Sequence, residues 1–170
     1  MLHPQKPFRR FSILLFTAFL FQSCTVEDSL ASEPTIYNVS QAQVVFERDF
    51  SFESSLLQTI NEYLISINQI ELTLSPEANQ IAFEHTKHLI ESNALHHNNF
   101  PDRQNYFLSL GFTGVKENVA MGINSASHLL QAWLQSPLHR QAIEANNTHT
   151  GISILKNENG IYFITQIYLK

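Results

Sequence analysis

Three side chains in the sequence have the chemistry of a metal or acid–base site: His97, Glu117 and His139. Two imidazoles and a carboxylate could hold Zn²⁺ or another divalent ion and leave one coordination position open. Alternatively, Glu117 could share a proton with a histidine, or the three side chains could only hydrogen-bond and hold loops together. They lie 20 and 22 residues apart, so spacing alone favours the structural role.

The remaining residues offer no recognised catalytic pattern. His85 and His88 lie three residues apart in a predicted helix but lack the His-Glu-x-x-His motif of zinc peptidases. Because His85 falls within an apolar stripe, we expect it to be a buried, hydrogen-bonded core residue. The sequence also has no Gly-x-Ser-x-Gly elbow, phosphate-binding glycine loop or Cys–His pair. The sequence therefore gives no support for acyl-transfer chemistry, and we expect no enzymatic activity.

Charge and composition exclude other classes of protein. The chain has 170 residues, of which 44% are apolar and 15% charged, as in one globular domain with appendages. From Cys24 onward it carries 7 basic and 15 acidic residues, a formal charge of −8. An acidic body without a basic patch is unsuited to phosphate backbones, so we expect no nucleic-acid partner. A single cysteine allows no internal disulfide.

Residues 1–23 have the pattern of a bacterial lipoprotein signal peptide. Three basic side chains precede the apolar run 11–21, which would rise about 16 Å as a helix, too little to cross a hydrocarbon core of ~30 Å. The segment that ends in Ser23-Cys24 resembles a lipobox, in which the cysteine is acylated and becomes the mature N-terminus. We therefore predict that acyl chains such as palmitate on Cys24 anchor the protein to a membrane. The alternative is a free cysteine beside an ordinary cleavage site.

The rest of the chain is predicted to be a tether over 24–52 and a domain over 53–170. The tether shows little periodicity, although residues 44–46 could pack onto the domain as a short strand. Helical spacing of apolar residues begins at Ser54, and Ser75-Pro76-Glu77 is a helix start with a capping hydroxyl and an early proline. Further helices are predicted through residues 106–110, over 125–135 and over 137–143, and an antiparallel hairpin over 150–155 and 161–168. Helices segregated from a terminal hairpin indicate an α+β fold.

Six segments between residues 53 and 170 match a known family in order. They are Leu72–Glu77, His97–Phe100 with Arg103, Glu117–Ala120, Trp133-x-x-Ser136-Pro137-x-His139-Arg140, Thr148–Ile152 and Tyr162–Gln166. Together they resemble the CAP superfamily of cysteine-rich secretory, antigen 5 and pathogenesis-related proteins, and above all its bacterial SCP-like branch.

This resemblance implies an α-β-α sandwich around a small, three-stranded antiparallel sheet. It also implies that His97 and Glu117 meet in a surface cleft with His139 nearby, and that Asn118 and Arg140 support the site. Eukaryotic members often have two histidines and two glutamates there, some of them binding a divalent metal. The four-residue set is incomplete here, because Ser136 and Phe163 stand at or near the other two positions. The candidate metal ligands are then His97, Glu117 and His139.

Two functional hypotheses follow, with a third as the structural alternative. The first is a non-enzymatic CAP-domain lipoprotein of a bacterial cell envelope, facing the periplasm or the exterior. It would bind a small molecule, lipid or protein partner in the cleft. The second is a metal-assisted, peptidase-like hydrolase, in which His97 and His139 hold the metal and Glu117 is a third ligand or the base that activates water. The third is a structural envelope protein whose His–Glu cluster serves stability. Trp133 is expected in the core.

Overall fold

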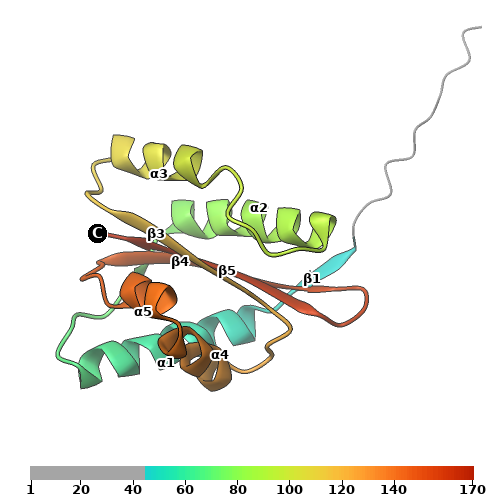
Figure 1. Ribbon diagram of the computed structural model, residues 1–170, viewed down its shortest axis with the longest axis horizontal. Coiled ribbons are helices and arrows are strands. Elements are labelled where there is room, and N and C mark those ends of the chain that lie inside the picture. The colour runs from blue at the N-terminus through green and yellow to red at the C-terminus, as the bar shows by residue number, and fades with distance from the viewer. Residues whose placement is uncertain (1–44) are drawn as a thin grey trace, which may run out of the picture. The chain divides into compact units, whose positions relative to one another are not determined.

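The computed structural model describes residues 45–170, so the predicted signal peptide, Cys24 and the tether as far as residue 44 lie outside the described residues. The described part contains five helices and five strands (Figure 1). In chain order they are β1 (Phe46–Arg48), α1 (Phe50–Ser66), β2 (Thr73–Leu74), α2 (Pro76–Ser92), α3 (Phe100–Ser109), β3 (Val115–Met121), α4 (Ala126–Gln135), α5 (Pro137–Ile143), β4 (His149–Asn157) and β5 (Tyr162–Leu169). Within this part, no helix combines the length and hydropathy needed to cross a membrane.

The sheet has the strand order β1-β4-β5-β3. The predicted hairpin is confirmed: β4 and β5 pair antiparallel, with Thr150 opposite Tyr168, and β5 pairs antiparallel with β3. The three-stranded sheet that the family resemblance implied is extended at its edge by two short strands. β1 pairs antiparallel with the end of β4, and β2 pairs parallel with its beginning.

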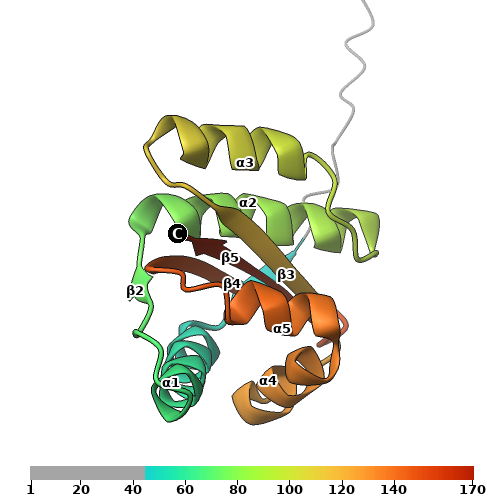
Figure 2. The same cartoon turned by 60° about the vertical axis from the view of Figure 1, so that its left-hand side comes forward.

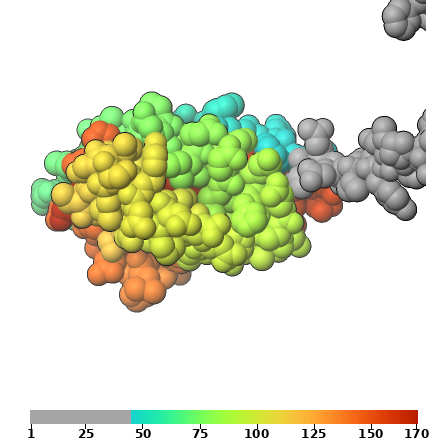
Figure 3. Space-filling model, turned by 90° about the horizontal axis from the view of Figure 1, so that it is seen from above, coloured from blue at the N-terminus to red at the C-terminus, as the bar shows by residue number. Residues whose placement is uncertain are grey.

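Helices cover both faces of the sheet, which confirms the α+β sandwich (Figures 1 and 2). α2 packs against β4 and β5 on one face, and α3 lies beside β3 on the same side. Figure 3 looks onto this face, where α2 and α3 form the outer surface. α1, α4 and α5 cover the opposite face. Its core includes Leu56, Ile60, Leu129 and Trp133, and the 2% exposure of Trp133 agrees with its expected core position.

Local signals in the sequence explain where α1 and α2 begin. The hydroxyl of Ser75 accepts a hydrogen bond from the Ala78 amide at 3.2 Å, as the predicted cap requires. Asp49 caps α1 in the same way, with its carboxylate 2.9 Å from the Phe52 amide. The folded domain therefore takes in residues before 53 that the sequence analysis had assigned to the tether.

Two of the elements that differ from those predicted from the residue pattern carry residues of the site described below. α3 begins at Phe100 rather than near Tyr106, in a stretch that looks irregular in sequence. Asn99 makes the preceding turn with a left-handed φ of 59°, which asparagine tolerates, and Pro101 fits the first turn of the helix. β3 was not predicted from the pattern because Lys116, Glu117 and Asn118 interrupt its apolar character.

Gly151 allows α2 to lie directly on the sheet. A Cβ atom at this position would be 2.6 Å from the Ala78 Cβ and closer still to the Ala78 carbonyl group. The absence of a side chain at Gly151 therefore sets the approach of α2 to β4. α2 in turn carries His85 to the face of the sheet from which Glu117 projects.

Candidate functional site

Glu117 is the centre of the candidate site. It projects from β3, and its side chain is 1% exposed. The Nδ1 of His97 lies 2.8 Å from Oε1. The guanidinium group of Arg103 contacts both oxygens, with Nε 2.8 Å from Oε2 and Nη2 2.8 Å from Oε1. Glu117 is thus a buried carboxylate held by a bidentate ion pair and a histidine.

Arg103 is placed by the first turn of α3. Besides Glu117, it binds the Asn98 carbonyl through Nη1 at 2.7 Å. The same side chain therefore fixes the loop that carries His97 and the carboxylate that binds His97. This double contact couples the position of the loop to the ionised state of Glu117.

His85 approaches Glu117 from α2. Its Nε2 donates to the His96 carbonyl at 3.0 Å and lies 3.5 Å from Glu117 Oε1. Burial lowers the pKa of His85 to about 4, even though the nearby carboxylate favours the charged ring. His85 is the buried, hydrogen-bonded histidine that was expected, and it also belongs to the environment of Glu117.

Glu117 is ionised at neutral pH despite its burial. Desolvation alone would raise its pKa, but hydrogen bonds from His97 and Arg103 and the charges nearby lower the pKa below its ordinary value. An ionised carboxylate only accepts hydrogen bonds, so His97 donates through Nδ1. When the ring is neutral, its Nε2 is then a free acceptor on a side chain that is 49% exposed.

A surface cleft of about 430 Å³, here called the His–Glu cleft, joins these groups to α5. His97, Glu117, Asn118 and His139 all line it, so the three candidate residues do come together at one surface. Burial, together with the nearby His97, lowers the pKa of His139 and favours its neutral ring. Apolar side chains of Phe100 and Leu138 complete the wall.

The two residues expected to support the site take different places. Asn118 donates through Nδ2 to the His139 carbonyl at 3.2 Å, which ties α5 to β3 and holds His139 over the cleft. Arg140 lies outside the lining of the His–Glu cleft. Its Nε is 3.6 Å from Glu144 on an exposed face of α5.

Comparisons with known proteins show the family of the chain and its fold. The sequence profile of the cysteine-rich secretory protein family (CAP) matches residues 57–168, well over half of the chain. The chain belongs to this family. No curated protein sequence gives a significant match.

Solved structures with the CAP fold include bacterial proteins. An outer surface protein from Borrelia burgdorferi aligns with a TM-score of 0.66 and 22% identity, over 74% of this chain and 98% of that protein. An extracellular SCP-domain protein from Bacillus anthracis gives a TM-score of 0.61 and 21% identity, over 71% of this chain and 40% of the other. A cysteine-rich secretory protein from Staphylococcus aureus gives 0.59 and 18%, over 70% of this chain and 38% of the other.

The CAP domain as it stands does not offer the predicted metal donor set. Within residues 45–170 there is no group of three or more His, Cys, Asp or Glu side chains arranged to hold a metal ion. Both oxygens of Glu117 already bind Arg103, and one of them also binds His97. A metal ion would have to displace the guanidinium group from a buried carboxylate. His97, Glu117 and His139 thus share a cleft without forming a ligand set.

Two residues of the CAP site were missed as site residues in the sequence analysis. His85 was assigned to the core, and Arg103 was noted only as part of a family motif. No local spacing relates either residue to Glu117, which lies 32 and 14 residues further along the chain. One feature of the sequence could have identified Arg103. It is the only arginine close to His97 in a chain poor in basic residues, and a buried glutamate requires a cation.

Proposed function

We propose that this protein is a lipid-anchored CAP-domain protein of the bacterial cell envelope that binds a small anionic ligand in the His–Glu cleft without chemical turnover. The observation that carries the proposal is the fixed orientation of His97. Glu117 holds its Nδ1 at 2.8 Å, so the other ring nitrogen is presented at the cleft. A histidine held in this way is a ready-made recognition group.

The charges around the cleft favour an anion. Arg103 neutralises Glu117, and Lys116 lines the same cleft. No carboxylate in residues 45–170 lies within ion-pair distance of the Lys116 ammonium group. The ammonium group of Lys116 and the one N–H of a neutral His139 can donate to a carboxylate, whose short apolar tail would pack on the apolar wall of the cleft. The free Nε2 of His97 suits a hydroxyl or amide donor on the same ligand.

The lining also explains why binding is favoured over hydrolysis. Among residues 45–170, it contains no serine, threonine or cysteine that His97 could activate. The metal-assisted alternative requires Glu117 as a ligand or a base, but Glu117 is held by Arg103. These features support a recognition site.

The envelope location rests on Cys24 and on the relatives. One similar structure is described as an outer surface protein and another as an extracellular protein. Growth of an expressing bacterium with an alkyne-labelled palmitate should label the wild-type protein and leave Cys24→Ser unlabelled. Equal labelling of both proteins, or of neither, would refute the lipid anchor at Cys24.

The binding proposal can be tested with hexanoate as the probe. We expect a hexanoate titration of residues 25–170 to shift the imidazole NMR signals of His97 and His139, with saturation. Lys116→Gln should weaken this binding at least tenfold, while the matched control Lys87→Gln, on the outer side of α2, should leave it unchanged. Absence of saturable shifts, or equal binding by the two variants, would refute an anion site in the cleft.

A further inference from the structure

A second hollow lies at the β4 edge of the sheet, where that edge is interrupted. β2 pairs with residues 149–150 of β4 and β1 pairs with 155–157, so the residues between them have a strand partner only on the β5 side. Side chains satisfy their outward amides instead. Asn79 Oδ1 accepts from the Ile152 amide at 2.9 Å, and Glu53 Oε1 accepts from Ile154 at 3.0 Å. Because two side chains fill less space than a strand, a groove remains.

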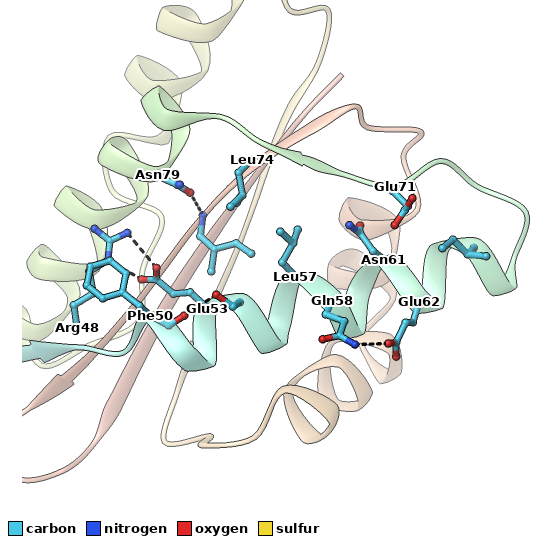
Figure 4. A pocket seen from close by; sticks show the side chains of 13 residues that line it. Arg48, Phe50, Glu53, Leu57, Gln58, Asn61, Glu62, Glu71, Leu74 and Asn79 are labelled. Atoms are coloured by element: carbon cyan, nitrogen blue, oxygen red, sulfur yellow. Dashed lines mark hydrogen bonds and ion pairs between the residues drawn. The ribbon is translucent and has the colours of Figure 1, made fainter.

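This groove, here called the α1 groove, has a volume of about 590 Å³ and runs along α1 (Figure 4). Its second wall is the segment that leads into β2. Asn61 holds this wall through Leu72, with Oδ1 2.8 Å from the amide and Nδ2 3.1 Å from the carbonyl. These contacts fix the wall against the helix, so the groove is formed before any partner arrives.

Large apolar side chains are exposed along the α1 groove. Phe50 is 65% exposed at one end, Leu74 is 43% exposed on the β2 wall, and Ile65 is 54% exposed at the other end. Phe50 and Ile65 are 15 residues apart on one helix, which corresponds to about 22 Å. An extended peptide of about seven residues spans that length. Several large exposed apolar side chains along one groove are typical of interaction sites.

The charged side chains that line the groove indicate which kind of partner it would bind. Three carboxylates line it, from Glu53, Glu62 and Glu71, against one cation. That cation, Arg48, is engaged by Glu53 through contacts of 2.8 and 3.2 Å. Glu62 accepts only from the neutral Gln58, at 2.8 Å. The lining therefore carries a net negative charge beside its apolar surface.

Two occupants from this protein itself are disfavoured by charge. Residues 25–44 contain three carboxylates and no lysine or arginine. A second copy would bring another acidic domain, because residues 45–170 hold 12 acidic and 7 basic side chains. Both would be repelled by the groove.

We propose that the α1 groove binds an extended segment of a partner protein in which apolar side chains alternate with lysine or arginine. The apolar side chains of the segment pack against Phe50, Leu74 and Ile65, and its cations face Glu62 and Glu71. The groove is lined by none of the residues of the His–Glu cleft, so this partner site is independent of the small-ligand site.

The test uses a fluorescein-labelled heptapeptide of alternating lysine and leucine, with a glutamate–leucine heptapeptide as the charge control. Fluorescence polarisation with residues 25–170 should show saturable binding of the basic peptide only. The double variant Glu62→Gln/Glu71→Gln should weaken it at least tenfold. The matched variant Glu84→Gln/Glu158→Gln should stay within twofold, since Glu84 pairs with Gln80 on α2 as Glu62 pairs with Gln58 on α1.

Apolar contact is tested separately with Ile65→Ser. Its control is Leu110→Ser, which alters a side chain of similar exposure outside the groove. We expect a loss of at least tenfold for Ile65→Ser and no loss for the control, with unchanged thermal unfolding of both. Equal binding by groove and control variants would overturn the proposal. A different result would also overturn the proposal: the basic peptide does not bind, but the protein binds phosphatidylglycerol vesicles or self-associates, and Ile65→Ser alone abolishes this. Such a result would favour a lipid or a second copy as the occupant.

Discussion

Arg103 binds Glu117 through both carboxylate oxygens, with one guanidinium nitrogen 2.8 Å from each. The planar fork of arginine matches a carboxylate in this arrangement and prevents its rotation. Oε1 is thereby kept in line with Nδ1 of His97. Arg103 is therefore a positioning residue, which acts on the cleft through Glu117.

We predict that Arg103→Ala lowers the free energy of unfolding by about 3–5 kcal/mol, because it leaves a buried carboxylate unpaired. Urea unfolding at pH 7 measures this change. Arg140→Ala is the control, since its contact with Glu144 is exposed and should contribute less than about 1 kcal/mol. Similar losses for the two variants would contradict a special role for the buried pair.

The pH dependence of the free energy of unfolding should reveal the protonation of His85. Its pKa is about 4 in the folded protein and near 6.5 when unfolded, so between these values only the unfolded chain binds the proton. Stability is then present above pH 6.5 and is lost as the pH falls to about 4, by roughly 3 kcal/mol in total. Glu117, with its lowered pKa, adds a further loss only below its ordinary value of 4.5.

Urea unfolding between pH 7 and pH 4.5 tests this assignment with His85→Gln. The stability of the variant should change less with pH, because glutamine has no group that titrates in this range, while its amide can still donate to the His96 carbonyl. An unchanged slope in the variant would assign the acid sensitivity to other groups.

Most helices and the hairpin could be predicted because their signals are local. Ser75-Pro76 marks the start of α2, and residues 157–160 make the turn between β4 and β5. β2 could not be predicted, since its two residues form a strand only by pairing with β4. β3 could not be predicted from the pattern, because Glu117 and Asn118 of the candidate site stand where an ordinary buried strand has apolar residues.

We predict that Gly151→Ala is among the most destabilising single-methyl additions in the domain. The new Cβ would collide with the backbone of Ala78, which cannot rotate away, and overpacking of this kind costs about 1–3 kcal/mol or more. Gly114→Ala is the matched control, because its nearest neighbour is the Lys170 side chain at 3.4 Å. Thermal unfolding should separate the two, and equal melting temperatures would show that α2 can shift.

Trp133→Ala should cost about 3–5 kcal/mol in the free energy of unfolding, because it empties a large volume between α4 and the sheet. Trp133→Phe should cost much less. It keeps most of the volume, and the indole N–H has no hydrogen-bond partner among the described residues. A loss below about 1 kcal/mol for Trp133→Ala would contradict the core role.

We expect that calorimetric titration of residues 25–170 with Zn²⁺ detects no one-to-one site in the His–Glu cleft. The reason is that a metal ion must compete with Arg103 for Glu117. Such a site would be recognised by the loss of its binding heat in both His97→Ala and His139→Ala. Site-specific heat lost in both variants would contradict this expectation. It would also favour the metal-assisted hydrolase over the binding proposal.

The candidate site was predictable in part. Family motifs indicated His97, Glu117 and His139, and these residues do line one cleft. The groups that control their ionisation could not be predicted from spacing. Arg103 reaches Glu117 only because Asn99 turns the chain into α3, and His85 does so only because Gly151 admits α2 to the sheet.

The strand order has a consequence for how the domain meets its surroundings. The described chain enters at β1, whereas Glu117 lies on β3 at the opposite edge, three strand spacings or about 14 Å away. β1 also pairs with the far end of β4, four to six residues beyond Gly151, which aligns through β5 with Glu117. The proposed ligand site therefore lies at the corner of the sheet that is diagonally opposite the point where the described chain enters it, on the side away from any attachment through the N-terminal end of β1.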